Sequence, residues 1–244
     1  MALPTGLDFP TEWSRGVPAR AARDLALTLG ISPLTKALAT LEVRGRENAT
    51  APGTHIFAAN HVSHLDTMLV LSALPHSVRK RTVVAAALDT FFLDSRKAIP
   101  TVLFFNAIPI ERHKVNRRSA ELAQKLLLEG WHLVIYPEGG RTTTGELMEF
   151  KAGAAYLSER TGASVVPTYI DGAGHLLGRR YAKADVYRRG SNSLRHHIIV
   201  AFGPPLLQLD GENMRRFGIR VQDAVADLGR RVSGDPDYGR RGAA

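Results

Sequence analysis

Hydrophobic positions along this chain follow two periods, and the two kinds of segment alternate. Short apolar runs predict strands at residues 41–43, 55–59, 82–87, 131–136, 164–170 and 196–202. Helical spacing predicts helices at residues 66–74, 95–105, 119–129, 151–160 and 210–232. Ser119 is a candidate cap and Gly130 a stop for the third of these, and the last is expected to break near Gly218. This alternation predicts an α/β fold with a mostly parallel or mixed β-sheet covered by helices.

The first forty residues have a pattern of their own. Helical spacing begins at Pro18, which suits the first position of a helix, and Gly30 and Pro33 divide the segment into two short helices. Alanines and leucines alternate there with basic residues, so we expect an N-terminal amphipathic helical segment over residues 1–40 and a separate domain over residues 41–244. The segment either lies in a membrane interface or packs its apolar face on the domain.

Composition narrows the classes of partner. The chain has 244 residues, 44% of them hydrophobic and 23% charged, which is ordinary for a globular domain. Its 32 Lys and Arg outnumber 23 Asp and Glu, so the surface attracts anionic partners. Nucleic acid is disfavoured because aromatic residues are 7% of the chain and no nucleic-acid-binding motif is present. The lack of cysteine excludes disulfides and a cysteine nucleophile. No apolar run is long enough to span a bilayer, and no signal peptide is recognised.

The sequence Asn-His-Val-Ser-His-Leu-Asp, residues 60–66, carries the most specific chemistry. It follows a predicted strand, with His61 at the strand end and Asp66 at the start of the next helix. A turn between them lets the two side chains meet, and the Ser63-x-x-Asp66 spacing resembles a capping box. A histidine oriented by a carboxylate is a general base for a hydroxyl group. His64 is a competitor for that role, and His61 is favoured because it stands at the strand end.

Two further motifs supply candidate anion ligands. Residues 106–112 end in Arg112, which either binds a phosphate or is a solvated arginine. Residues 136–142 follow a buried strand, and there Gly139 and Gly140 let the backbone approach a ligand while Arg141 offers a planar guanidinium. Lys151, at the start of a predicted helix, adds a point charge. We expect no metal site, because Glu138 has no second carboxylate at suitable spacing and more plausibly pairs with an arginine or with backbone amides.

Together these blocks resemble the lysophosphatidic acid acyltransferase family, also called 1-acylglycerol-3-phosphate O-acyltransferases. Residues 60–66, 106–112, 137–142 and 165–167 match four ordered blocks, and the resemblance covers roughly residues 40–206. It implies that His61 is the base, that Asp66 is its partner, and that residues 41–244 are an acyltransferase domain. It further implies a glycerol-phosphate site shaped by four residues, namely Arg112, Glu138, Gly139 and Arg141. The chain departs from the family pattern at Glu111, Gly140 and Thr142, and Gly140 removes a hydroxyl beside that site.

The resemblance also implies the partners. The expected acceptor is a lysophospholipid, most simply 1-acylglycerol-3-phosphate, and the expected co-substrate is acyl-CoA or acyl-carrier protein, with no bound cofactor. We expect a cytoplasmic protein, peripheral on the inner face of the cell membrane. Four phenylalanines are candidates for lining an acyl-chain groove, with ordinary core packing as the alternative: Phe91, Phe92, Phe104 and Phe105.

Two other functions stay open from the sequence. The acceptor could be another polar lipid, or the chain could be a catalytically inactive basic membrane-binding module. The intact pair of His61 and Asp66 argues against the inactive module. A serine hydrolase is disfavoured because the chain contains no Gly-x-Ser-x-Gly stretch.

Overall fold

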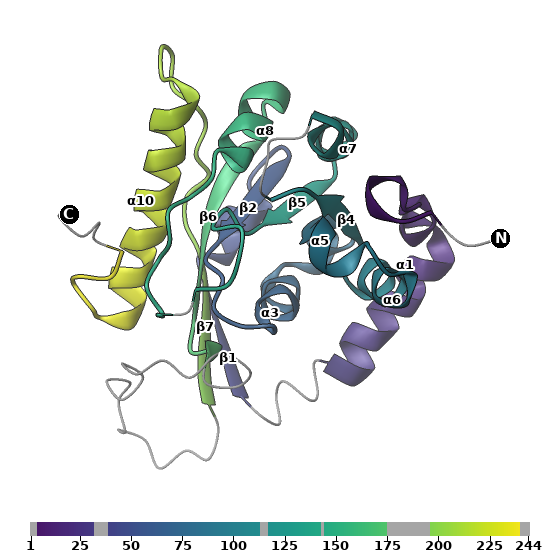
Figure 1. Ribbon diagram of the computed structural model, residues 1–244. Helices are drawn as coiled ribbons and strands as arrows, with labels where there is room; N and C mark the ends of the chain where they lie inside the picture. The colour runs from purple at the N-terminus through teal and green to yellow at the C-terminus, as the bar shows by residue number, and fades with distance from the viewer. Residues whose placement is uncertain (1–3, 32–38, 113–116, 143, 175–195, 240–244) are drawn as a thin grey trace.

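A single seven-stranded sheet forms the centre of the molecule (Figure 1). The structure is a computed structural model and describes residues 4–31, 39–112, 117–142, 144–174 and 196–239. The strand order is β1-β7-β6-β2-β5-β3-β4, and only the β6–β7 pair is antiparallel. The strands are β1 (Ala39–Arg44), β2 (His55–Ala59), β3 (Thr82–Ala87), β4 (Ala107–Ile110), β5 (His132–Ile135), β6 (Ser164–Asp171) and β7 (His196–Phe202). The prediction of a mostly parallel sheet covered by helices is confirmed.

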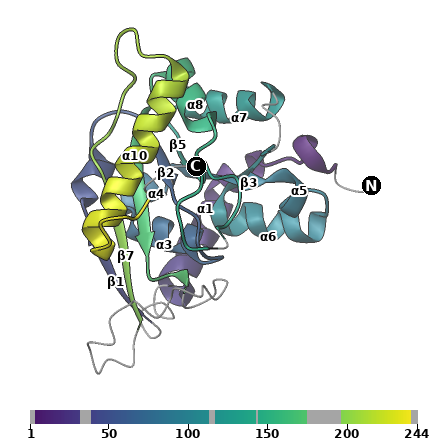
Figure 2. The ribbon, with the colours of Figure 1, turned by 60° about the vertical axis from the view of Figure 1, so that its left-hand side comes forward.

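Helices cover both faces of the sheet, so the central strands are apolar on both sides. In β2, Phe57 and Ala59 face one hydrophobic core, while Ile56 and Ala58 face the other. The first core includes residues of α3 (Asp66–Ala73), and the second those of α7 (Arg117–Leu128), α8 (Gly153–Thr161) and α10 (Met214–Ser233). Figure 2 shows α10 running along the sheet beside α8. Short helices α4 (His76–Arg79) and η4 (Arg46–Thr50) lie between strands in the sequence.

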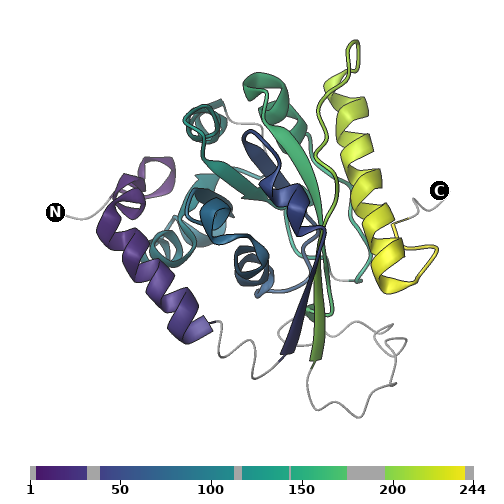
Figure 3. The ribbon, with the colours of Figure 1, turned by 180° about the vertical axis from the view of Figure 1, so that it is seen from behind.

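The N-terminal segment packs on the domain at the β4 end of the sheet (Figure 3). Its helix α1 contacts α6, and a buried arginine, Arg23, fixes the contact by donating to the backbone carbonyls of Leu103 and Ser14 at 2.8 and 3.0 Å. Burial lowers the pKa of Arg23 to about 10, so it stays charged at neutral pH. The helices here are η1 (Gly6–Asp8), η2 (Glu12–Arg15), α1 (Val17–Leu25), η3 (Ala26–Ile31), α5 (Leu88–Phe91) and α6 (Ser95–Phe105).

Several predicted boundaries are wrong, each for a local reason. The third predicted helix begins at Arg117, before Ser119, so Ser119 is not its N-cap. The last helix runs unbroken through Gly218, because Asn213 caps its start and Gly218 lies where α10 passes close to Ala155 of α8. The helical turn of η3 likewise passes through Gly30. The predicted helix after Pro33 lies mostly outside the described residues. Among the residues described, no helix is both long and apolar enough to cross a membrane.

Candidate active site

The carboxyl ends of β2 and β5, which are neighbouring parallel strands, bring together the first and third motifs. His61 follows β2 by one residue and Asp66 begins α3. The Nδ1 atom of His61 lies 2.8 Å from Oδ2 of Asp66, so the two side chains meet as the spacing predicts. Because an ionised carboxylate only accepts hydrogen bonds, Nδ1 is the donor, and the lone pair of the neutral ring is on Nε2. Asp66 is fully buried, whereas the His61 side chain is 21% exposed.

The turn between these residues is organised by the same carboxylate oxygen. Oδ2 of Asp66 also accepts the backbone N–H groups of Val62 and Ser63, at 2.7 and 2.8 Å. One half of the predicted capping box is therefore present. In the other half, the Ser63 hydroxyl accepts from the backbone N–H of Leu65 at 3.2 Å, and not from Asp66. Three donors on one oxygen hold Asp66 in place as the partner of His61.

Residues 136–142 hold the backbone of His61 from the other side. Oε1 of Glu138 accepts the His61 N–H at 2.7 Å, and the Thr142 N–H donates to the His61 carbonyl at 2.9 Å. Oε2 of Glu138 accepts the Met148 N–H at 3.0 Å. Glu138 thus pairs with backbone amides, as one of the two expectations had it, and both of its carboxylate oxygens point toward the polypeptide backbone. Burial raises the pKa of Glu138 to about 7, although both amides favour the ionised form.

Three predicted cationic residues lie around this loop and differ in their partners. Arg112 donates to Asp89 at 2.8 and 3.1 Å and to the Gly139 carbonyl at 3.3 Å. The Lys151 ammonium donates to the Arg112 carbonyl at 2.7 Å. Arg141 is half-buried and makes no hydrogen bond or ion pair with the residues that the structure describes. Its charge is available to an anionic ligand.

The positive charge of Arg141 affects the pKa of a neighbouring histidine. The pKa of His64 is lowered by partial burial and then by the nearby Arg141 guanidinium and His61 imidazole. His64 is exposed, and the carboxylate of Asp66 bonds to His61 and not to it. The Arg141 guanidinium and the His61–Asp66 pair therefore lie in one region at the sheet edge.

Gly139 is required by the backbone at this turn. Its φ is +73°, and a Cβ atom there would lie 2.5 Å from the Lys151 ammonium nitrogen. Gly140 has no such restriction, and a Cβ there would lie 3.9 Å from an Arg112 guanidinium nitrogen. The first glycine thus allows Lys151 to cross the turn, while the second leaves open space beside Arg112.

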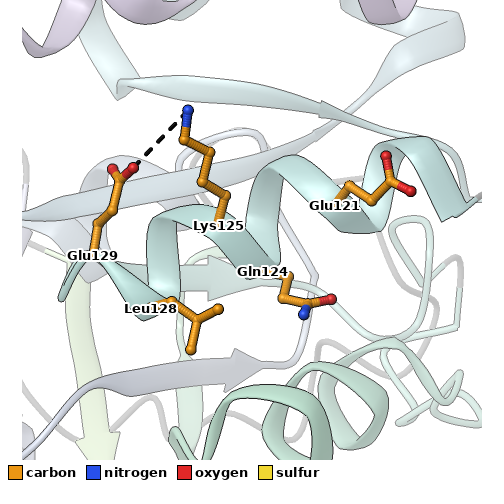
Figure 4. Close-up of a pocket in the computed structure, with 5 residues that line it drawn as sticks. All are labelled: Glu121, Gln124, Lys125, Leu128 and Glu129. Atoms are coloured by element: carbon orange, nitrogen blue, oxygen red, sulfur yellow. Dashed lines mark ion pairs between the residues drawn. The ribbon is translucent and has the colours of Figure 1, made fainter.

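The candidate acyl-groove phenylalanines do not lie in one environment. Phe92 is fully buried and packs edge-on against Phe9 with ring centroids 5.8 Å apart, which is core packing. Phe104 is 41% exposed on α6. A hollow of about 370 Å³ lies instead against α7 (Figure 4), lined by Glu121, Gln124, Lys125, Leu128 and Glu129. None of these five belongs to the candidate site.

One contact of the site was not anticipated from the sequence. The Tyr136 ring stacks on the His61 imidazole, with centroids 4.2 Å apart and planes 22° apart. Its hydroxyl lies 3.1 Å from the Thr67 hydroxyl on α3. A tyrosine at the end of a buried strand gives no signal of such a contact, because the partner is 75 residues away in the sequence.

A histidine–carboxylate pair at the carboxyl edge of an α/β sheet is an arrangement that can take the proton of a hydroxyl group. The Acyltransferase family model matches residues 40–171, more than half of the chain. The chain belongs to the acyltransferase family.

Named relatives agree with this assignment. A probable 1-acyl-sn-glycerol-3-phosphate acyltransferase of Mycoplasma pneumoniae is 30% identical over 173 residues, which is 65% of this chain and 61% of that protein. The 1-acyl-sn-glycerol-3-phosphate acyltransferase of Saccharomyces cerevisiae is 26% identical over 80% of this chain and 62% of its own length. The chain thus spans about three fifths of these curated relatives. The family resemblance expected from the four motifs is confirmed.

The fold has a counterpart among solved structures. The crystal structure of the 1-acyl-sn-glycerophosphate (LPA) acyltransferase PlsC from Thermotoga maritima superposes with a TM-score of 0.57. The match covers 90% of this chain and 81% of that one, at 18% sequence identity. At this identity the likeness concerns the fold.

Proposed function

We propose that the protein transfers a fatty acyl group from a thioester to the free hydroxyl of a lysophospholipid, most simply 1-acylglycerol-3-phosphate. The observation that carries the proposal is the 2.8 Å contact between His61 and Asp66, with the Arg141 guanidinium in the same region. The relatives' names, which specify this reaction, support the same acceptor.

The chemistry follows from the histidine tautomer. Nε2 of His61 takes the proton of the acceptor hydroxyl as its oxygen attacks the thioester carbonyl carbon. The C–S bond then breaks, and the leaving thiolate recovers that proton from the imidazolium, which Asp66 stabilises. Acyl-CoA and acyl-carrier protein present the same thioester, so both are donor candidates, and the reaction needs no bound cofactor or metal.

Arg141 is the proposed ligand of the acceptor phosphate. A guanidinium that has no hydrogen-bond or ion-pair partner among the described residues can bind two phosphate oxygens, and Lys151 adds positive charge nearby. Arg112 is already paired with Asp89, so we assign it a secondary role that depends on opening that pair. Glu138, Gly139 and Gly140 shape the loop that carries Arg141, and Arg112 contacts this loop through the Gly139 carbonyl.

We further propose that the protein works at a membrane surface, on the inner face of the cell membrane. Exposed large apolar side chains gather in the N-terminal segment and in α6, which contacts it: Trp13, Val17, Leu25, Leu29, Ile99 and Phe104. The net charge of +9 favours anionic lipid. Replacing Leu25 and Leu29 by serine should reduce sedimentation with vesicles containing phosphatidylglycerol. Equal sedimentation of the native and double-variant proteins would contradict the assignment.

A thiol-release assay tests the catalytic proposal. The chain has no cysteine, so a thiol reagent detects only the coenzyme A that is set free. We expect release from acyl-CoA to depend on added lysophosphatidic acid and to vanish in His61→Ala. The matched control is His64→Ala, which changes a histidine of the same turn that Asp66 does not contact. Loss of release in His64→Ala with release retained in His61→Ala would overturn the choice of base. An acyl-carrier protein donor is the second arm.

A further inference from the structure

The Tyr136 side chain covers one face of the His61 ring. The ring centroids lie 4.2 Å apart with an interplanar angle of 22°, which is a stacked arrangement. Asp66 holds one nitrogen of the imidazole at 2.8 Å but cannot by itself stop the ring from tilting about that bond. A flat surface against the ring face restricts that tilt.

Tyr136 is itself fixed at both ends. Its backbone follows β5 directly, and its hydroxyl lies 3.1 Å from the Thr67 hydroxyl in the first turn of α3. Asp66, the residue before Thr67, begins that same helix. The tyrosine therefore joins the end of β5 to the helix that carries the carboxylate, and the imidazole lies against this link.

The charge state of the tyrosine suits this position. Burial and the nearby Asp66 carboxylate raise the pKa of the Tyr136 phenol well above its usual value of 10. The ring therefore stays neutral throughout the pH range in which a histidine titrates. An imidazolium that forms during proton transfer would meet the electron-rich face of a neutral aromatic ring, which attracts cations.

We propose that Tyr136 is a positioning residue for His61, holding the imidazole plane so that Nε2 points toward the acceptor hydroxyl. The inference rests on the proposed acyl transfer. It predicts an effect on kcat and little effect on KM, because Tyr136 contacts the base and not a group assigned to either substrate. Loss of ring orientation should lower kcat by about 10- to 100-fold, the scale expected when a catalytic group is misplaced by a fraction of an ångström to an ångström.

Two substitutions separate stacking from general packing. Tyr136→Phe keeps the aromatic face and loses only the hydroxyl contact, so kcat should stay within about threefold of native. Tyr136→Leu keeps apolar bulk and loses the face, so kcat should fall by the full factor with both KM values unchanged. Equal kcat for Tyr136→Leu and the native protein, or a change confined to KM, would overturn the proposal.

A spectroscopic readout makes the inference independent of activity. A proton above an aromatic face is shifted upfield, so the His61 ring-proton resonance should be displaced upfield in the native protein. His61→Ala identifies that resonance among the nine histidines. The displacement should persist in Tyr136→Phe and disappear in Tyr136→Leu. If Tyr136→Leu does not fold, the spectra of Thr67→Val and of the native protein remain as tests. An undisplaced His61 ring-proton resonance in the native protein would contradict the stacking. An inactive native protein with a displaced resonance would refute the acyl transfer alone.

Discussion

Glu138 is expected to make the fold less stable while it makes the site more active. Its carboxylate is 3% exposed and accepts two backbone N–H groups, one of them from His61. Burial raises its pKa from 4.5 to about 7. Between these two values the folded protein holds a proton that the unfolded chain has released. The contribution of Glu138 to the free energy of unfolding therefore falls as pH rises from 4.5 to about 7 and then levels off.

The magnitude follows from the difference of about 2.5 pKa units, which corresponds to about 3 kcal/mol at pH 8. Glu138→Gln is neutral at every pH and resembles the protonated acid. We expect the variant to match the native protein in stability near pH 5 and to be more stable by about 2 to 3 kcal/mol at pH 8. Denaturant unfolding at a series of pH values measures this difference. The matched control is Glu149→Gln, which removes an exposed carboxylate from the same segment and should reproduce the native pH dependence.

The activity of the same variant should change in the opposite direction. The glutamine presents one oxygen and one N–H₂ group, so either the His61 or the Met148 amide loses its acceptor. A displaced His61 should lower kcat by roughly 10- to 100-fold. The acid limb of native kcat/KM should include the protonation of Glu138 near pH 7. In Glu138→Gln that step should be absent. A variant with native kcat, or with the native slope of stability against pH, would refute this reasoning.

Three other substitutions test the roles of Asp66, Gly139 and His132. Asp66→Asn should lower kcat by about 10²- to 10⁴-fold, because an amide can stabilise the wrong tautomer of His61; native turnover would remove Asp66 from the mechanism. Gly139→Ala should lower Tm, because alanine is strained at a φ of +73°. It should also raise KM for a phosphorylated acceptor, because the new Cβ displaces the Lys151 ammonium. An unchanged KM in a folded variant would show that Lys151 does not contribute to acceptor binding. Burial lowers the pKa of His132 to about 4, so the contribution of His132 to the free energy of unfolding should fall as pH drops from 6.5 to 4, by about 2 to 3 kcal/mol in all. His132→Phe should abolish this pH dependence, which chemical denaturation at a series of pH values measures. A pH dependence that persists in the variant would show that His132 is not its cause.

The sequence predicted most of the fold because apolar runs and their stops are local signals. The strands at residues 55–59, 82–87 and 196–202 match β2, β3 and β7 at both ends. Strand β4 was not predicted, because its four residues lie within the motif that ends in Arg112. The expected break at Gly218 was wrong because an isolated glycine gives the same sequence signal whether a helix ends there or continues.

In the candidate site, too, contacts between residues near in the sequence were predictable and contacts between distant residues were not. The contact of His61 with Asp66 was predictable, since strand end and helix start lie five residues apart. The sequence does not show which of the cationic side chains already has a partner. Arg112 pairs with Asp89, which lies 23 residues away on another element. The stacking of Tyr136 on His61 depends on β2 and β5 being neighbours, which periodicity along one chain does not specify.

The central claim is that His61 activates the hydroxyl of a lysophospholipid for direct attack on an acyl thioester. Mass spectrometry of the lipid products tests it most directly, with acyl-CoA and lysophosphatidic acid supplied to the native protein and to His61→Ala. We expect phosphatidic acid from the native protein, formed one for one with free coenzyme A, and none above background from His61→Ala. Equal product from both proteins, or free fatty acid in place of phosphatidic acid, would contradict it.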